Sequence, residues 1–421
     1  MQKIEFNTIC IVGLGYIGLP TAVAFANSGK QVIGVDINPQ VVKTVNQGKV
    51  HFVEPQLQEL VQQAVKNGLF FATGEVQPAD AFVIAVPTPL TADYQPDLSY
   101  IQSAAMAIAP HLRQGNLVVL ESTSPVGTTE QIAQWFKQAR PDLRLPLDTK
   151  NEADIYIAYC PERVLPGKVM TELFENDRVV GGLTPKCSEQ AVDFYQIFAK
   201  GNCIQTDART AEMCKLVENS FRDVNIAFAN ELSMICDELG INVWELIELA
   251  NRHPRVNILQ PSAGVGGHCI AVDPWFIVSQ SPQLARLVRT AREVNNSKPQ
   301  WVIEKVKKVL ADCTIEKDCK PSELTIACLG LSFKPDIDDL RESPALNITR
   351  QIADWHSGRV LAVEPNIQSL SLAKVQLVDL ATALNQADIL VLLVDHKPFK
   401  NVPIEQIQQT CIVDCRGVWK R

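Results

Sequence analysis

Residues 264–273, GVGGHCIAVD, place a histidine, a cysteine and an aspartate after three glycines. Glycine loses much backbone freedom when it is ordered and has no side chain to pack, so this loop indicates a backbone drawn close to another group. Cys269 then has three candidate roles: a nucleophile, a metal ligand, or a small buried side chain. A metal site would need Cys269 to bind together with His268 and His253. Adjacent residues such as His268 and Cys269 rarely bind one metal ion together, and the chain has no C-x-x-C pair that would indicate a metal site. We therefore predict no metal site.

A second group of polar residues lies in residues 207–251, where apolar residues recur with helical spacing. At about 100° of rotation per residue, four polar side chains fall on one side of the predicted helix: Glu212, Lys215, Asn219 and Arg222. Two explanations remain open. The four residues form a solvated face, or they form a buried polar stripe in which Lys215 and Asn219 hold a substrate oxygen.

The N-terminal segment TICIVGLGYIGLP contains G-x-G-x-x-G directly after an apolar strand and at the start of a helix. Gly13 makes the turn, Gly15 lets the backbone approach a pyrophosphate, and Gly18 lets the helix pack against the strand. The helix N-terminus presents partial positive charge to the phosphates. Asp36 ends the next strand, where a carboxylate accepts a hydrogen bond from a ribose 2′-hydroxyl and repels a 2′-phosphate. The pattern predicts NAD rather than NADP as the cofactor.

A thiol beside a nicotinamide has a definite chemical use. Cys269 can add to an aldehyde and form a thiohemiacetal, whose hydride leaves to a second NAD. The resulting thioester is then hydrolysed to a carboxylate. Asp273, four residues after the cysteine, can order a water molecule or a lysine for these steps.

These side chains need a scaffold, and the sequence predicts one. Short apolar runs at 81–89, 116–125 and 154–163 are separated by helical segments, and each run ends in polar or proline-rich residues. Runs of this kind are typical of parallel strands covered on both faces, with binding loops at their ends.

The last part of the chain repeats the order of the first. LTIACLGLSFKP, RVLAVEPNI and ADILVLLVDHKPF follow one another as a strand and turn, a second strand and a third strand. The turn lacks G-x-G-x-x-G and carries Phe333, Lys334 and Arg341, so we expect a different phosphate ligand there. We predict an α/β fold with two doubly wound Rossmann-like domains joined by a central helical region with a long helix. The predicted domains are 1–205, 206–312 and 313–421.

Composition limits the remaining possibilities. The chain has 421 residues, 46% of them hydrophobic, and a net charge of −8, which argues against nonspecific nucleic-acid binding. Any anionic ligand must meet a local basic cluster. No apolar run approaches the length of a membrane span, and the start, MQKIEFNTICIVGLG, lacks the features of a signal peptide. We expect a soluble cytoplasmic protein whose 12 cysteines are reduced.

Seven motifs together resemble those of the UDP-glucose/UDP-mannuronate dehydrogenase family, in the family's order and nearly end to end. They are GLGYIGLP, VPTP, ESTSPVGTT, CPERVLPG, EMCKLVENSFRDVNIAFANEL, GVGGHCIAVDP and GLSFKPDIDDLRESP. The family often reads G-x-C-x-P-K-D at the cysteine, whereas this chain has no lysine there and places Val272 before Asp273. HCI-x-VDP resembles the branch that acts on UDP-N-acetylhexosamines.

The resemblance implies an NAD-dependent UDP-sugar 6-dehydrogenase that uses two NAD per substrate. The expected reaction is the four-electron oxidation of UDP-N-acetyl-D-mannosamine to UDP-N-acetyl-D-mannosaminuronate, for enterobacterial common antigen or a related surface polysaccharide. Three alternatives stay open: UDP-N-acetylglucosamine as the substrate, a two-electron hydroxyacid dehydrogenase that needs no cysteine, and an NAD-binding regulator without catalysis.

The resemblance also assigns roles to residues. Cys269 would be the nucleophile, Lys215 would stabilise the oxyanion beside Asn219, and Asp273 would orient water or act as a base. Water for thioester hydrolysis would be positioned by Glu162 and Thr123. The implied cofactor residues are Gly13, Gly15, Tyr16, Ile17, Gly18, Asp36, Pro87, Thr88, Ser122, Thr123 and Arg341. The implied substrate residues are Glu162, Arg163, Val164, Leu165, Lys215, Asn219, Arg255, Asn257, Gly264, Gly266, Gly267, Phe333, Lys334 and Arg416.

Finally, the resemblance implies an oligomer. The family's arginine that matches Arg255 reaches the site of the neighbouring subunit. We therefore expect a homodimer, or a higher oligomer built from it, formed through the 207–251 helix.

Overall fold

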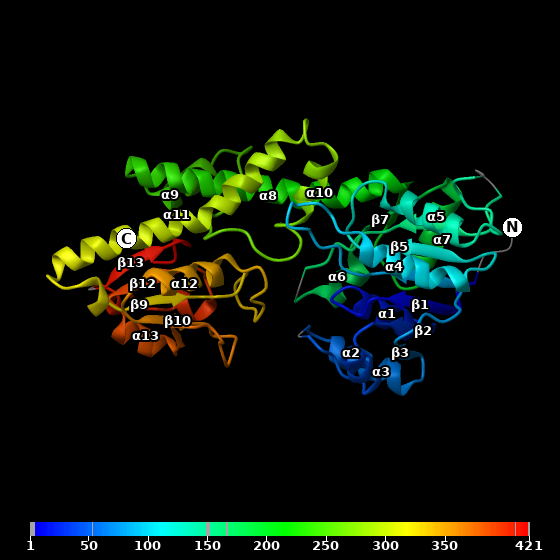
Figure 1. Cartoon of the computed structure of the whole chain (residues 1–421), viewed down its shortest axis with the longest axis horizontal. Helices are drawn as coiled ribbons and strands as arrows, with labels where there is room; N and C mark the ends of the chain where they lie inside the picture. Colours follow the sequence, from blue (N-terminus) through cyan, green and yellow to red (C-terminus); the bar gives the residue numbers. More distant parts are fainter. Residues whose placement is uncertain (1–4, 53, 149–151, 166, 409, 420–421) are drawn as a thin grey trace. The chain divides into compact units, whose positions relative to one another are not determined.

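The computed structural model describes residues 5–52, 54–148, 152–165, 167–408 and 410–419. The chain divides into two compact units, and each is described by itself. The first comprises Met1–Glu218 with Trp275–Gln280, and the second comprises Asn219–Pro274 with Ser281–Arg421. Figure 1 follows the chain through both units by colour.

The first unit is built on an eight-stranded sheet in the order β3-β2-β1-β4-β5-β6-β7-β8. All neighbouring strands are parallel except β6 and β7. The strands are β1 (Thr8–Val12), β2 (Gln31–Val35), β3 (Phe70–Thr73), β4 (Ala81–Ile84), β5 (Leu117–Leu120), β6 (Tyr156–Tyr159), β7 (Arg178–Gly182) and β8 (Cys203–Asp207).

Helices cover both faces of this sheet (Figure 1). They are α1 (Gly18–Asn27), α2 (Pro39–Asn46), α3 (Leu57–Lys66), α4 (Ser99–Ile108), α5 (Thr128–Ala139), α6 (Val169–Glu175) and α7 (Pro185–Tyr195). Alternate residues of β1 enter different apolar clusters, because side chains of a strand point to opposite faces. Ile9 and Ile11 pack with α1, α3 and α7, whereas Cys10 packs with α4 and α5. Because these strands are buried on both faces of the sheet, their sequences are unbroken apolar runs rather than alternating ones.

The second unit contains a five-stranded sheet in the order β11-β10-β9-β12-β13, with every pair parallel. The strands are β9 (Ile326–Leu329), β10 (Val360–Val363), β11 (Val375–Leu377), β12 (Ile389–Leu392) and β13 (Cys411–Asp414). One face packs on α11 (Arg286–Glu316) and α12 (Pro344–Trp355), and the other packs on α13 (Leu380–Gln386) and α14 (Lys397–Lys400). The predicted fold class, with a second doubly wound sheet, is confirmed.

The remaining helices are α8 (Ala208–Leu239), α9 (Val243–Ala250) and α10 (Asp273–Gln280). Helix α8 has 32 residues, so the predicted long helix is present. Within the second unit, α8 and α11 run in the same direction and are joined by buried polar contacts. Arg292 Nη1 donates to Asp223 Oδ1 at 2.6 Å, and Asn295 Nδ2 donates to the same oxygen at 2.8 Å. Asn230 Nδ2 then donates to Asn295 Oδ1 at 2.9 Å.

The expectation that all cysteines are reduced is wrong for one pair. Cys313 on α11 and Cys411 on β13 form a disulfide across 98 residues of sequence. Their spacing along the chain gives no sign of this pairing, because α11 comes to lie against β13 only in the folded domain. The other cysteines among the described residues are not joined in disulfides.

A search of the described residues finds no helix with the length and apolar character needed to cross a membrane.

We predict that Arg292→Met lowers the free energy of unfolding by about 3 kcal/mol, because it leaves the buried carboxylate of Asp223 without its cation. Arg292 and Asp223 are 2% and 0% exposed. The matched control is Arg209→Met, which removes an ion pair with Glu130 in which the arginine side chain is 62% exposed. The control should cost less than about 1 kcal/mol. Thermal and urea unfolding of both variants measure the difference, and equal losses would contradict the prediction.

Candidate functional site

Gly13 and Gly18 in the first loop have the structural roles that the sequence predicts, a turn and a close helix–strand contact. Gly13 has a φ of +97°, which favours glycine. A Cβ on Gly18 would lie 1.8 Å from the carbonyl oxygen of Gly13, so α1 can approach the strand this closely only with glycine there. A Cβ on Gly15 would meet nothing within 4 Å, so this side of the loop is open. No side chain caps the N-terminus of α1. The loop therefore has the space and the helix terminus that a pyrophosphate needs.

Asp36 follows β2 and faces this loop. Its Oδ2 accepts a hydrogen bond from the amide of Leu14 at 3.0 Å, and its Oδ1 accepts one from Asn38 at 2.9 Å. Tyr16 lies in the loop and stacks on Phe52 with ring centroids 4.2 Å apart. The carboxylate thus lies at the end of the second strand, as predicted, and Ile17 is the N-cap residue of α1.

The loops after β4 and β5 supply the other predicted cofactor residues. Pro87 is exposed, and the hydroxyl oxygen of Thr88 is buried without a hydrogen-bond partner among the described residues. Ser122 Oγ instead donates to the carbonyl of Val86 at 2.7 Å, so this hydroxyl holds the two loops together. Ser124, which the sequence analysis did not single out, also has a buried hydroxyl without a partner in the described residues. Buried polar groups are normally paired, so Thr88 and Ser124 indicate a place where a ligand donates or accepts.

Glu162 follows β6 and is buried. Its Oε2 accepts a hydrogen bond from Arg178 Nη2 at 3.3 Å, and its Oε1 accepts one from the amide of Arg163 at 2.7 Å. Arg163 pairs with Glu218 at 2.7 Å, and Leu165 is 55% exposed. The loop after β6 therefore carries a buried carboxylate, Glu162, that is paired with Arg178 of β7, and an exposed apolar side chain, Leu165. Thr123 is half-buried after β5, and Val164 is half-buried against the core.

Asn219 joins the long helix to the cysteine loop. Its Nδ2 donates to Asp273 Oδ2 at 2.5 Å, and the amide of Asp273 donates to the carbonyl of Cys269 at 2.8 Å. Asp273 is 2% exposed, whereas Cys269 is exposed. Lys215 precedes Asn219 by about one turn of α8, is half-buried, and forms no ion pair with another described residue. Of the four polar residues predicted on this side of the helix, Glu212 is fully buried and accepts hydrogen bonds from Thr129, whereas Asn219, like Lys215, is half-buried and Arg222 is exposed. The four residues are therefore neither a uniformly solvated face nor a uniformly buried stripe.

The glycines before Cys269 pack against the loop after β9. A Cβ on Gly266 would lie 2.4 Å from the carbonyl oxygen of Glu342, and one on Gly267 would lie 3.1 Å from the ring of Phe333. A Cβ on Gly264 would lie 2.9 Å from Pro344. The structure thus gives these glycines a packing role that the sequence analysis did not consider.

A buried asparagine holds the same loop from the other side. Asn230 Oδ1 accepts the amide of Ser262 at 2.8 Å, and Ser262 Oγ donates to the carbonyl of Gly264 at 2.9 Å. Asn251 accepts the amide of Ile258 at 2.7 Å. The loop that carries Cys269 is therefore tied to α8 and α9. Arg255 and Asn257 are exposed on it.

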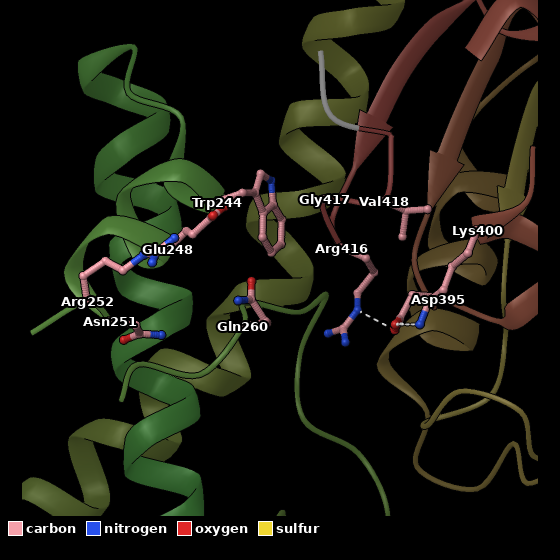
Figure 2. Close-up of a pocket in the computed structure, with 10 residues that line it drawn as sticks. All are labelled: Trp244, Glu248, Asn251, Arg252, Gln260, Asp395, Lys400, Arg416, Gly417 and Val418. Carbon is pink, nitrogen blue, oxygen red and sulfur yellow. Dashed lines mark hydrogen bonds and ion pairs between the residues drawn. The ribbon is translucent and has the colours of Figure 1, made fainter. Parts of the chain in front are cut away.

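A cavity of about 690 Å³ lies in the second unit where β12 and β13 end. Figure 2 shows Trp244, Glu248, Asn251 and Arg252 on one side, and Asp395, Lys400 and Arg416 on the other. Arg416 Nε donates to Asp395 Oδ1 at 2.8 Å, and its Nη1 donates to the carbonyl of Pro261 at 2.9 Å. Burial raises the pKa of Asp395, but Arg416 and Lys400 outweigh it and the pKa is lowered. Cavities at the carboxyl ends of parallel strands are the usual ligand sites of such sheets.

Lys334 and Phe333 lie in the loop after β9, and Lys334 is exposed. Two buried residues that the sequence analysis missed hold this loop. Glu364 Oε2 accepts the amides of Leu331 and Ser332 at 2.7 and 3.0 Å, and lies 3.0 Å from His396 Nε2. His396 Nδ1 accepts the amide of Asp336 at 2.9 Å, so the proton is on Nε2. Arg341, predicted to bind the cofactor, pairs with Asp339 at 2.6 Å.

The fold and these sites define a class of protein. The chain matches three domains of the UDP-glucose/GDP-mannose dehydrogenase family: the NAD binding domain over residues 7–199, the central domain over 209–297, and the UDP binding domain over 327–421. The chain belongs to this family.

Particular relatives are close in sequence. UDP-N-acetyl-D-mannosamine dehydrogenase of Yersinia pestis is 63% identical over 99% of this chain and 100% of its own length. NDP-N-acetyl-D-galactosaminuronic acid dehydrogenase of Ralstonia nicotianae is 59% identical over 99% of this chain and 97% of its own length. The solved structure of UDP-D-ManNAc dehydrogenase from Pyrococcus horikoshii superposes with a TM-score of 0.88 at 38% identity, covering 98% of this chain and 96% of that one.

Family membership confirms an NAD-dependent nucleotide-sugar dehydrogenase with a UDP binding domain. The residues at the carboxyl ends of β1, β2 and β4 fit NAD, because Gly15 leaves open space and Asp36 retains acceptor capacity. Thr88 also has a buried hydroxyl without a hydrogen-bond partner among the described residues. The individual roles of the predicted site residues, and the domain boundaries at 205 and 312, stay predictions.

We predict that Asp36→Asn raises KM for NAD about tenfold, because one charged acceptor for the ribose hydroxyls is lost. The same change should improve the use of NADP, since the repulsion of a 2′-phosphate is removed. The control Asp379→Asn changes an exposed helix cap of the second sheet and should leave both KM values unchanged. Initial rates with each cofactor measure this, and an unaltered preference for NAD would contradict the role of Asp36.

Proposed function

We propose that this chain oxidises UDP-N-acetyl-D-mannosamine at C6 to UDP-N-acetyl-D-mannosaminuronate, using two NAD. The observation that carries the proposal is the exposed Cys269 and the way its loop is held. The backbone carbonyl of Cys269 accepts the backbone amide of Asp273, and the carboxylate of Asp273 accepts a hydrogen bond from Asn219 of α8. A nucleophilic thiol needs both access and a supported loop. The 63% identity to the dehydrogenase of Yersinia pestis favours the substrate.

The side chains have the following roles in the proposed reaction. Bound NAD supplies the hydride acceptor for both oxidations. Lys215 and Asn219 hold the C6 oxygen while the alcohol loses its proton and becomes an aldehyde. The sulfur of Cys269 then forms a bond to C6, and the aldehyde oxygen takes up a proton to give the thiohemiacetal. Lys215 is well suited to the oxygen because it has no competing ion pair within the described residues.

The second oxidation leaves a thioester on Cys269, which water must cleave. Water gives its hydroxyl to the acyl carbon, the carbon–sulfur bond breaks, and the thiolate is restored. In this proposal Asp273, a buried carboxylate held by Asn219, orients that water or takes its proton. In this proposal Glu162 and Thr123 act on the same step.

The phosphates of the substrate would lie on the second sheet. Lys334 is an exposed cation on a loop that the buried pair Glu364 and His396 holds. The cavity beside Arg416 offers a guanidinium, an aromatic side chain and an amide from Gln260. A cationic site of this kind suits a nucleoside diphosphate.

We further propose a homodimer in which Arg255 completes the site of the partner chain. Support comes from a row of exposed apolar side chains on α8. Phe221, Phe228, Ile235 and Leu239 are 70%, 51%, 46% and 65% exposed, at spacings of seven and four residues that place them on one side of a helix. Such a face is rarely left in water.

We also propose that the enzyme acts in the cytoplasm and serves the synthesis of enterobacterial common antigen or a related polysaccharide. Loss of the uronic-acid polymer on deletion of the gene, with activity in the cytoplasmic fraction, checks this.

A panel of nucleotide sugars tests the reaction. We expect UDP-N-acetyl-D-mannosamine to give two NADH per sugar with the highest kcat/KM. UDP-N-acetylglucosamine and NDP-N-acetylgalactosamine are the competitors, the latter because the Ralstonia relative is 59% identical. Cys269→Ser should stop turnover before the acid forms, because the variant has no thiol to form the thiohemiacetal and then the thioester. Two NADH per sugar at the wild-type rate from this variant would exclude the covalent step.

Mixed dimers test the role of Arg255. Arg255→Ala and Cys269→Ala chains should each be inactive alone. If the arginine acts on the partner's site, unfolding and refolding an equal mixture restores about a quarter of wild-type activity, since half of the dimers carry one complete site. An equal mixture of Arg255→Ala and wild type measures the yield of refolding. An inactive mixture with a normal dimer mass would show that Arg255 acts within its own chain.

A further inference from the structure

A buried group of two carboxyls, one guanidinium and one phenol lies in the first unit. This carboxyl cluster consists of Glu121, Glu162, Arg178 and Tyr195. Their exposures are 2%, 7%, 4% and 0%. Glu121 follows β5, Glu162 follows β6, Arg178 begins β7 and Tyr195 ends α7. The cluster thus ties together the carboxyl ends of two strands whose loops carry predicted catalytic residues.

Tyr195 links the two carboxyls. Its hydroxyl donates to Glu121 Oε1 at 2.7 Å, and its ring lies 4.8 Å from the guanidinium carbon of Arg178. Arg178 in turn donates to Glu162 at 3.3 Å. The second oxygen of Glu121 accepts from Thr21 on α1 at 3.2 Å. Both oxygens of Glu121 are therefore held by neutral hydroxyl groups, while Glu162 has the cation.

The cluster has more acid groups than cations. If both carboxyls ionise, one negative charge remains uncompensated in a dry site, which is costly. Burial and the nearby charge of Glu162 together raise the pKa of Glu121 to about 7, against the opposing effects of Arg178, Tyr195 and Thr21. The other titratable neighbour is Cys160, whose thiol pKa is raised to about 12 by burial, so it stays neutral.

We propose that Glu121 is a positioning residue for hydrolysis of the thioester, and that its protonation state sets the charge of the carboxyl cluster around Glu162. The inference rests on the proposed function, because it assumes that Glu162 acts on the water. Glu121 directly precedes Ser122 and Thr123, so the same backbone carries the positioning residue and a predicted catalytic residue.

The physical consequence is a change in the electrostatic potential at the loops that carry Glu162 and Thr123. When Glu121 releases its proton, the added negative charge stabilises the positive charge that develops as water gives up a proton during hydrolysis. Hydrolysis should therefore become faster as pH rises through 7, and Glu121→Gln, which cannot ionise, should lack this increase.

The test follows acid release after the second NADH in rapid-quench experiments between pH 5.5 and 8.5. We expect the wild-type rate to rise roughly three- to tenfold through an inflection near pH 7. Glu121→Gln should show no such inflection, with an unchanged KM for the UDP-sugar. Glu121→Asp should restore part of it. The control Glu130→Gln alters a carboxyl that pairs with Arg209 on the surface, and it should behave as wild type.

Two measurements test the proton itself, without any substrate. Difference infrared spectra should show a protonated carboxyl that titrates near pH 7 in wild type and is missing in Glu121→Gln. Because the folded state holds this proton more tightly than the unfolded state, the thermal midpoint of wild type should fall relative to Glu121→Gln as pH rises from 5 to 7.

The outcomes separate the two proposals. Acid release with the same inflection in wild type and Glu121→Gln overturns the role of Glu121, even if the infrared band is present. Absence of the band also overturns it. If no acyl-enzyme forms on Cys269, the proposed function fails together with the hydrolytic role, and the infrared and stability results still report the protonation of Glu121.

Discussion

The pairing of Arg292 with Asp223 between α8 and α11 supports the arrangement of the second unit. Both side chains are buried, and a charge without its partner there would be costly. The pair extends through Asn295 to Asn230, which binds the backbone of Ser262 in the loop that leads to Cys269. Lys298 continues the row by donating to Ser233 at 2.6 Å. The loop that carries Cys269 is thus held by a buried polar row, and leaving a polar atom of such a row without a partner is costly.

A different principle governs the first unit. There the sheet is covered on both faces, and the predicted ligand residues come from loops at the carboxyl ends of β1, β2, β4, β5 and β6. Hydrogen bonds between loops hold these residues, such as Ser122 to Val86 and Leu14 to Asp36. The sheet is their common support, and the predicted site residues are distributed along its carboxyl edge.

Local patterns in the sequence predict much of this structure. The glycine loop, Asp36 and the apolar strands are visible because each depends on neighbours a few residues away. The two doubly wound sheets and the long helix follow from the same local signals. By contrast, the disulfide between Cys313 and Cys411, the network of Glu121 and the pair Glu364–His396 depend on contacts between segments far apart in the chain. The sequence also shows Gly264, Gly266 and Gly267 but not their packing on Phe333 and Pro344, because composition does not say which surface a glycine faces.

The repeated strand ends also put one carboxylate to two different uses. Asp36 and Glu364 occupy the same place after the second strand of their sheets, and each binds the loop after the first strand. Asp36 accepts two backbone amides and has lone pairs to spare, whereas Glu364 is saturated by Leu331, Ser332, Asn366 and His396. The two carboxylates therefore differ in what they can still accept: Asp36 has acceptor sites left for a further donor, whereas Glu364 is committed to its own loop and to His396.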